Sequence, residues 1–207
     1  MTATPGATPD PVIELRRSSL DKLLIAAGIV VAVVMAVAGG LLTWGSNFAS
    51  NYVHDELSSQ NIFFSSEESL LAEDPPRTDL VPLAGQQVLT GAHAEKYASY
   101  ISGHLPELSY AEQGPGVTDA RNALNEARES NAPAAEISEL EAEYNRLNGQ
   151  RETTFKGETL RGLLLSTYAW STIGNIAGIA AWVAFAAAAV MVVLVIAGLV
   201  HINKHKK

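Results

Sequence analysis

The chain has 207 residues, of which 47% are hydrophobic, no cysteine, and a formal net charge of −8 at pH 7. The lack of cysteine excludes disulfides, thiolate nucleophiles, cysteine-held metals and covalently attached haem. An acidic chain also disfavours nucleic acid as a partner, because phosphate backbones are bound through Lys and Arg.

The first residues differ in composition from the rest of the chain. Residues 1–11 are rich in Thr, Ala and Pro and have no hydrophobic periodicity, which is typical of a disordered tail. We expect residues 1–19 to form a tail on the cytoplasmic side.

An apolar stretch comes after this tail. From Leu23 to Leu42 there is no Asp, Glu, Lys, Arg or His. A helix of roughly 20 apolar residues crosses the hydrocarbon core of a bilayer, so residues 20–44 are predicted to be a transmembrane helix. The apolar stretch exceeds the 7–15 residues of a signal-peptide core and no clean Ala-x-Ala site follows. Retention as an anchor is therefore expected rather than cleavage.

The central segment, residues 45–158, is polar and predicted to be mainly helical. Pro75, Pro76 and Pro82 indicate a loop, and Gly114-Pro115-Gly116 indicates a second break. Asn131 is placed to cap the next helix. The Ile62–Phe64 run is a short strand or a buried linker. The expected helices are Phe48–Asn61, Gly91–His104, Thr118–Glu129 and Pro133–Leu147, the last two forming a hairpin within residues 112–150.

A second apolar stretch, Leu163 to Val200, is longer than one bilayer requires. We expect one long helix over residues 159–200. Its first part is predicted to stand outside the bilayer, and its membrane part to begin near Ile176. A basic cytoplasmic tail of residues 201–207 ends the chain.

Charge predicts the orientation. The flanks carry six Lys and Arg against three acids, whereas Gly45 to Ser171 carries 19 Asp and Glu against 8 Lys and Arg, a net charge of −11. Because short basic flanks stay in the cytoplasm, both termini are expected inside and the central domain outside a plasma (inner) membrane. The acidic domain is suited to a soluble basic partner, but negative charge is also a common means of staying soluble.

Small residues recur within both spans and predict close helix packing, either within the chain or with a partner. Trp44, Trp170 and Trp182 are predicted interfacial anchors. The predicted packing residues are Gly28, Ala32, Ala36, Gly40, Gly174, Gly178, Ala180, Ala184 and Ala188.

No catalytic site is predicted. The chain lacks a Gly-x-Ser-x-Gly elbow, a phosphate-binding glycine loop and a His-Glu-x-x-His motif. His93, Tyr97, Tyr100 and His104 share one helix face, but His93 and His104 are about 16 Å apart along a straight helix. This stripe is expected to pack against the membrane-proximal helices with its polar tips on water or backbone. We expect no metal and no cofactor.

Several sequence segments carry a family resemblance. They are Thr43-Trp44-Gly45, Leu57–Ile62, Gly85–Val88, Ala94–Leu105 and Thr159–Leu164. With them the chain resembles a family of small two-span actinobacterial membrane proteins of unassigned role, whose members often bear the label of aromatic ring-opening dioxygenases. It is also similar to a small accessory subunit of the actinobacterial respiratory supercomplex, which joins a menaquinol–cytochrome c reductase to a cytochrome c oxidase. The resemblance implies a shared fold and leaves the activity open.

The sequence therefore predicts a mainly α protein with two transmembrane helices and an extracytoplasmic α-helical domain between them. The leading hypothesis is a non-catalytic accessory or scaffold subunit that associates with a larger integral membrane complex. An exported sensor or ligand-binding protein is the alternative. A His-based metal enzyme is a third hypothesis, resting only on the His and Tyr stripe.

Overall fold

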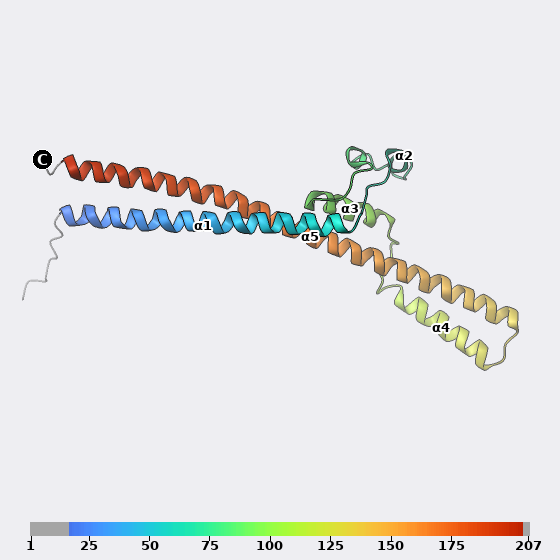
Figure 1. Ribbon diagram of the computed structural model, residues 1–207. Coiled ribbons are helices and arrows are strands. Elements are labelled where there is room, and N and C mark those ends of the chain that lie inside the picture. The colour runs from blue at the N-terminus through green and yellow to red at the C-terminus, as the bar shows by residue number, and fades with distance from the viewer. Residues whose placement is uncertain (1–16, 205–207) are drawn as a thin grey trace, which may run out of the picture. The chain divides into compact units, whose positions relative to one another are not determined.

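A computed structural model describes residues 17–204 (Figure 1). The chain is mainly helical, and the part described contains no strand, only an antiparallel bridge between Phe63 and Gln87. The helices are α1 (Arg17–Ser59), α2 (Glu67–Leu71), the 3₁₀ helix η1 (Val81–Leu83), α3 (Gly91–His104), α4 (Gly114–Glu129) and α5 (Ala134–Lys204).

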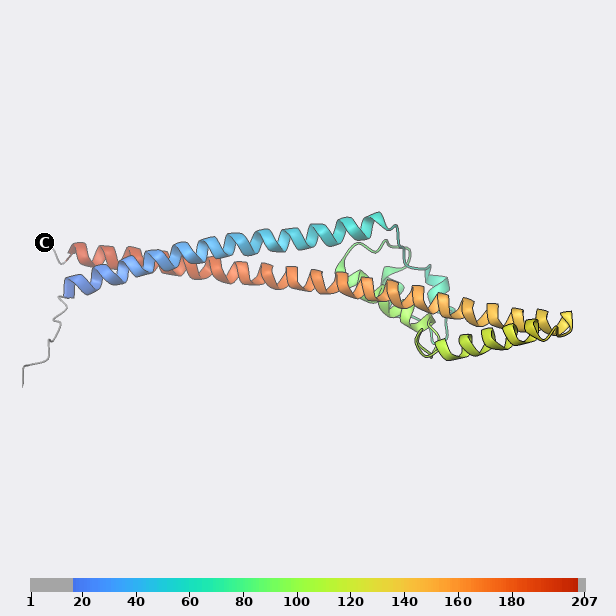
Figure 2. The same cartoon turned by 90° about the horizontal axis from the view of Figure 1, so that it is seen from below.

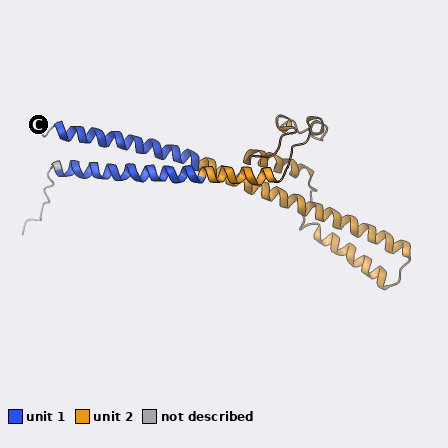
Figure 3. Cartoon of the chain, viewed as in Figure 1, with its two compact units in different colours: residues 1–45, 177–207 blue, residues 46–176 orange. Residues whose placement is uncertain are grey.

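The chain divides into two compact units (Figure 3). The helix-pair unit holds residues up to Gly45 and from Ala177 onward, and the central unit holds Ser46–Ile176. Helices α1 and α5 each contribute to both units, whereas α2, η1, α3 and α4 belong to the central unit alone.

In the helix-pair unit, α1 and α5 run antiparallel and pack directly on each other (Figures 1 and 2). Gly28 of α1 lies against Val195 of α5, and Gly39 lies against Phe185. Residues further along α1 therefore contact residues earlier in α5, as antiparallel helices do. Both helices are long and apolar enough to cross a membrane. Only 17% and 11% of their most apolar windows are buried, whereas the core helix of a soluble protein would be mostly covered.

The buried positions of α5 in this unit alternate in steps of three and four. Ala181, Ala184 and Ala188 are buried, and Met191, Val195 and Gly198 continue the same line as half-buried residues. A contact line with a 3.5-residue period is the geometry of left-handed coiled-coil packing. Alanine and glycine at these positions allow the two backbones to approach closely.

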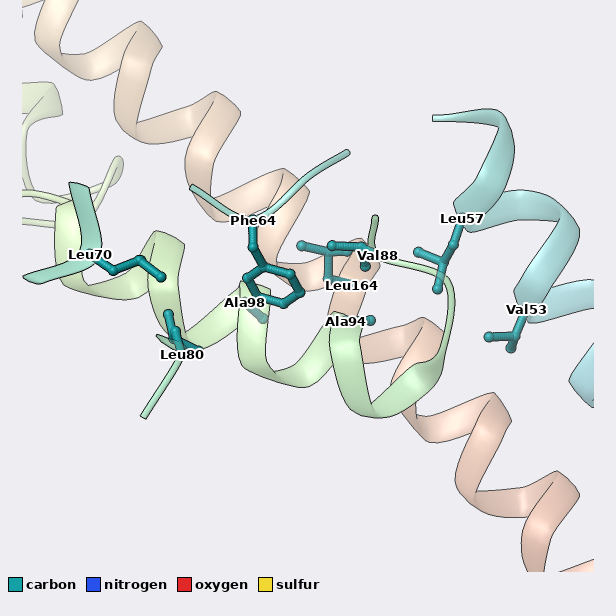
Figure 4. Close-up of a cluster of buried hydrophobic side chains, with 9 residues drawn as sticks. All are labelled: Val53, Leu57, Phe64, Leu70, Leu80, Val88, Ala94, Ala98 and Leu164. Carbon is teal, nitrogen blue, oxygen red and sulfur yellow. The ribbon is translucent and has the colours of Figure 1, made fainter. Parts of the chain in front are cut away.

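The core of the central unit lies where α1, α3 and the connecting segment (residues 60–90) meet α5 (Figure 4). The side chains of Leu57, Leu70, Leu80, Val88 and Leu164 are almost completely buried. Val53, Phe64, Ala94 and Ala98 complete the cluster. At roughly 1.5–3 kcal/mol for each buried aliphatic side chain, this cluster is the main source of stability in the unit.

Several predicted elements are confirmed. Helix α3 has the predicted bounds, with the Thr90 hydroxyl accepting a hydrogen bond from the His93 amide as its N-cap. The helix predicted beyond the first span is continuous with it in α1. The Ile62–Phe64 segment is an extended linker with the single bridge at Phe63, and Phe64 is buried.

Two breaks between helices were predicted wrongly. Gly114-Pro115-Gly116 does not break the chain but begins α4, because proline is tolerated in the first turn of a helix. The helix expected from Thr159 begins at Ala134, so the second arm of the hairpin and the membrane span are one helix.

The predicted role of Asn131 is also wrong. Asn131 adopts a left-handed conformation, with φ of 55°, just after α4. Its amide donates to the Arg128 carbonyl and the Ala132 amide donates to the Ala127 carbonyl, a Schellman motif that ends α4. Asparagine suits this position because it tolerates positive φ better than most residues.

Candidate partner face and the surroundings of the predicted site residues

Gly28 and Ala32 lie at the contact between the two helices of the helix-pair unit. Ala32 is 8% exposed. A Cβ atom at Gly28 would lie 2.8 Å from Val195 Cγ2, so the contact requires a residue without a side chain. These two predicted packing residues therefore contact the chain's own second span.

Ala36 and Gly40 lie away from this contact. Both are exposed, and a Cβ atom at Gly40 would meet nothing within 4 Å. Residues spaced by four rotate about 40° per step around a helix, so Ala36 and Gly40 lie about 80° and about 120° from Gly28. The row of predicted small residues therefore rotates away from the contact between α1 and α5. Its last two members, Ala36 and Gly40, lie on an exposed apolar face.

The predicted small residues of α5 have varied surroundings. Ala184 and Ala188 are buried in the helix-pair unit, and Gly178 and Ala180 are half-buried. Gly174 belongs to the central unit, where a Cβ atom would lie 2.9 Å from Ala49 Cβ.

The contact residues that were not predicted from the sequence include Gly39, Ala49 and Ala181. A Cβ atom at Gly39 would lie 2.9 Å from the Phe185 ring, and Ala49 and Ala181 are each 3% exposed. A 3.5-residue period would have found Gly39, since it lies only about 20° from Gly28 around the helix.

The three tryptophans are all exposed side chains. Trp44, Trp170 and Trp182 are 70%, 48% and 78% exposed, as interfacial residues would be. Phe48 and Tyr52, one and two turns beyond Trp44, stack with ring centroids 6.2 Å apart.

The His and Tyr stripe of α3 packs against the connecting segment rather than against the membrane-proximal helices. The Phe64 ring makes T-shaped contacts with the rings of His93 and Tyr97, with centroids 6.0 Å and 5.4 Å apart. Tyr100 continues the row, its hydroxyl 2.9 Å from that of Ser65. The rings thus hold α3 to the segment that leads away from α1.

The polar tips of this stripe have local partners. Nδ1 of His93 lies 3.3 Å from the Gln87 carbonyl, and Nδ1 of His104 lies 2.9 Å from the Tyr100 carbonyl. Nε2 of His104 lies 3.6 Å from Glu73. Burial raises the pKa of the Tyr97 hydroxyl. No group of three or more His, Cys, Asp or Glu able to hold a metal occurs among residues 17–204.

An ion pair closes the other side of the connecting segment. Nε and Nη2 of Arg77 donate to the two carboxylate oxygens of Asp79 at 3.0 Å and 3.2 Å. Arg77 also donates to the Ser99 carbonyl and lies over the Tyr100 ring. The hydrogen bond from Arg77 lowers the pKa of Asp79.

A buried polar contact fastens the start of α4 to α5. Thr154 is 1% exposed, and its hydroxyl donates to the Gln150 carbonyl and accepts from Nε2 of Gln113 at 2.9 Å. The Arg151 guanidinium lies 3.9 Å from the centre of the Tyr110 ring. Among the described residues no buried side-chain nitrogen or oxygen lacks a hydrogen-bond partner, which is consistent with a structural role for these contacts.

Comparison with known proteins found no family model, no curated protein and no solved structure that matches this chain.

Proposed function

We propose that this protein is a non-catalytic membrane subunit that associates with a larger integral membrane complex and carries a helical extracytoplasmic domain. The observation that carries the proposal is the exposure of both apolar helices, whose mutual contact covers only a narrow line of each. The remaining apolar surface suits lipid and other membrane helices.

The exposed face around Ala36 and Gly40 is the proposed partner surface. The internal contact uses Gly28, Ala32 and Gly39, which leaves Ala36 and Gly40 as small residues where a second backbone can approach. In a membrane such approach is favourable through van der Waals packing and the release of lipid.

The sequence resemblance supports one complex as the first to test. The menaquinol–cytochrome c reductase and cytochrome c oxidase supercomplex is the proposed partner. The acidic composition of the central segment is consistent with contact to a basic soluble partner.

Affinity purification in mild detergent tests the proposal. Tagged wild-type protein should recover the same membrane proteins reproducibly, identified by mass spectrometry. Ala36→Leu and Gly40→Leu should each reduce that recovery about tenfold, which corresponds to about 1.4 kcal/mol of association free energy. Both should still insert, because leucine favours the bilayer.

Val34→Leu is the matched control, since Val34 is 56% exposed and lies about 160° around α1 from Ala36. Equal recovery by all three variants would remove Ala36 and Gly40 from the partner surface. Wild-type protein that recovers no membrane protein would overturn the subunit proposal itself.

A further inference from the structure

A groove lies between α1 and α5 within the helix-pair unit, with a volume of about 550 Å³. Its floor is the close contact of the two helices, where Gly28 lies under Val195 and Gly198 lies 3.3 Å, measured from an added Cβ, from Ile25. Its walls include Leu24 and Leu194, which are 66% and 58% exposed. Glycines on both helices allow the backbones to approach closely, and the longer side chains beside these glycines form the walls of the groove.

The groove is amphipathic along its length. Most of its lining is aliphatic, and only Asp21 and His201 at one end are ionisable. Lys22 follows Asp21 in α1, Lys204 follows His201 by one turn in α5, and both lysines are exposed. An apolar groove with ionisable groups at one end matches a lipid molecule, which has an apolar acyl chain and a polar headgroup.

We propose that this groove binds one anionic phospholipid, its acyl chain along the aliphatic lining and its phosphate at the end that carries Lys22 and Lys204. Charge complementarity selects the headgroup, because the exposed Lys22 and Lys204 lie close along the helices to Asp21 and His201, and Asp21 is the single carboxylate in the lining at that end. Basic pockets between membrane helices bind anionic headgroups in this manner, and lysine side chains extend to the headgroup level.

Asp21 limits the expected preference of the groove for an anionic over a zwitterionic lipid. Its carboxylate repels a phosphate and offsets part of the attraction of one lysine, so the selectivity over a zwitterionic lipid should be several-fold rather than absolute. The acyl contact is independent of charge and should retain lipid of either class.

Native mass spectrometry of the full-length purified protein tests this inference. The protein is titrated with phosphatidylglycerol and with phosphatidylcholine of the same acyl chains. Wild type should retain one phosphatidylglycerol per chain with several-fold preference. Ala197→Phe places a ring in the groove and should lose retained lipid of both classes, whereas Ala189→Phe, at an exposed position outside the groove, should not.

A pair of charge variants separates headgroup from chain binding. Lys22→Gln with Lys204→Gln should retain lipid but lose the preference for phosphatidylglycerol. Lys96→Gln with Lys156→Gln, in the central unit, changes the formal charge equally and should keep it. Loss of preference in both pairs would reveal only an effect of net charge and would overturn the site.

Other occupants would also be detected. A mass of two chains without lipid would identify a second copy in the groove and overturn the lipid site, and lipid retained equally by Ala197→Phe and Ala189→Phe would overturn the groove as the binding site. The inference shares with the proposed function only the location of these helices in a bilayer. Because the titration uses the isolated chain, its failure leaves the recovery of a partner complex untouched.

Discussion

Gly91 begins α3 at a point where the central unit has no room for a side chain. An added Cβ atom would overlap the Ser171 side chain and lie 3.3 Å from the Tyr168 backbone. Both obstacles belong to α5, and a backbone cannot move as the tip of a flexible side chain does. The N-terminus of α3 is therefore fixed against α5 by the absence of a single methyl group.

Gly91→Ala should destabilise the protein by about 1–3 kcal/mol, as overpacking of a well-filled site does. Gly103→Ala is the control in the same helix. A Cβ atom at Gly103 would meet only the Arg77 guanidinium at 3.6 Å, so that variant should lose nothing and gain up to about 1 kcal/mol from the reduced freedom of the unfolded chain. Denaturant unfolding in detergent measures both. Equal effects would show that α3 does not contact α5 at Gly91.

The Arg77–Asp79 pair should make stability depend on pH in the acid range. The pKa of Asp79 is lower in the folded protein than in the unfolded chain, so Asp79 stabilises the fold above about pH 4 and this contribution is lost as the pH falls through the folded pKa. The Asp79 side chain is 47% exposed, which limits the contribution to about 1 kcal/mol or less.

Asp79→Asn tests this linkage by comparison with wild type. The difference in unfolding free energy should be constant from about pH 5 to 7 and shrink as the pH falls below about 4. The other acidic residues are the same in both proteins, so their contributions cancel in the difference. A difference in unfolding free energy that stays constant at low pH would show that Asp79 acts through its shape and not its charge.

At the level of elements, local sequence signals were sufficient to predict the bounds of a helix whose ends are determined by residues close in sequence. Helix α3 has a Thr90 cap and a stripe of rings spaced by three and four, and its bounds were predicted correctly. The start of α5 was missed because the apolar stretch was taken to mark the helix. Residues 148–158 are mostly polar but contain no proline, and the two isolated glycines, Gly149 and Gly157, do not end the helix.

The packing residues show a different limit. Gly28 and Ala32, which are spaced by four, both lie at the contact between the two helices, but the contact follows the 3.5-residue period of two helices that wind around each other. The choice between Gly39 and Gly40, adjacent and chemically identical, depends on where Phe185 lies. No pattern within α1 alone contains that information.

At the scale of the whole molecule, two helices are shared between two units with different surroundings. The segments of α1 and α5 in the helix-pair unit have exposed aliphatic surfaces, whereas those in the central unit contribute Val53, Leu57 and Leu164 to a core formed with the connecting segment and α3. Each unit therefore depends on the same two helices but is stabilised differently, the helix-pair unit by the close packing of small residues along one line and the central unit by burial of a hydrophobic cluster.

The orientation of the chain can be tested with single thiols, since the natural sequence has no cysteine. Ser138→Cys in α5 and Ser19→Cys in α1 are both exposed positions and nearly isosteric changes. A membrane-impermeant maleimide applied to intact cells should label Ser138→Cys, because the acidic central segment is expected outside. Ser19→Cys should be labelled only after permeabilisation, because its flank carries Arg16, Arg17 and Lys22. The reverse pattern would invert the topology and place the groove end bearing Lys22 and Lys204 in the outer leaflet.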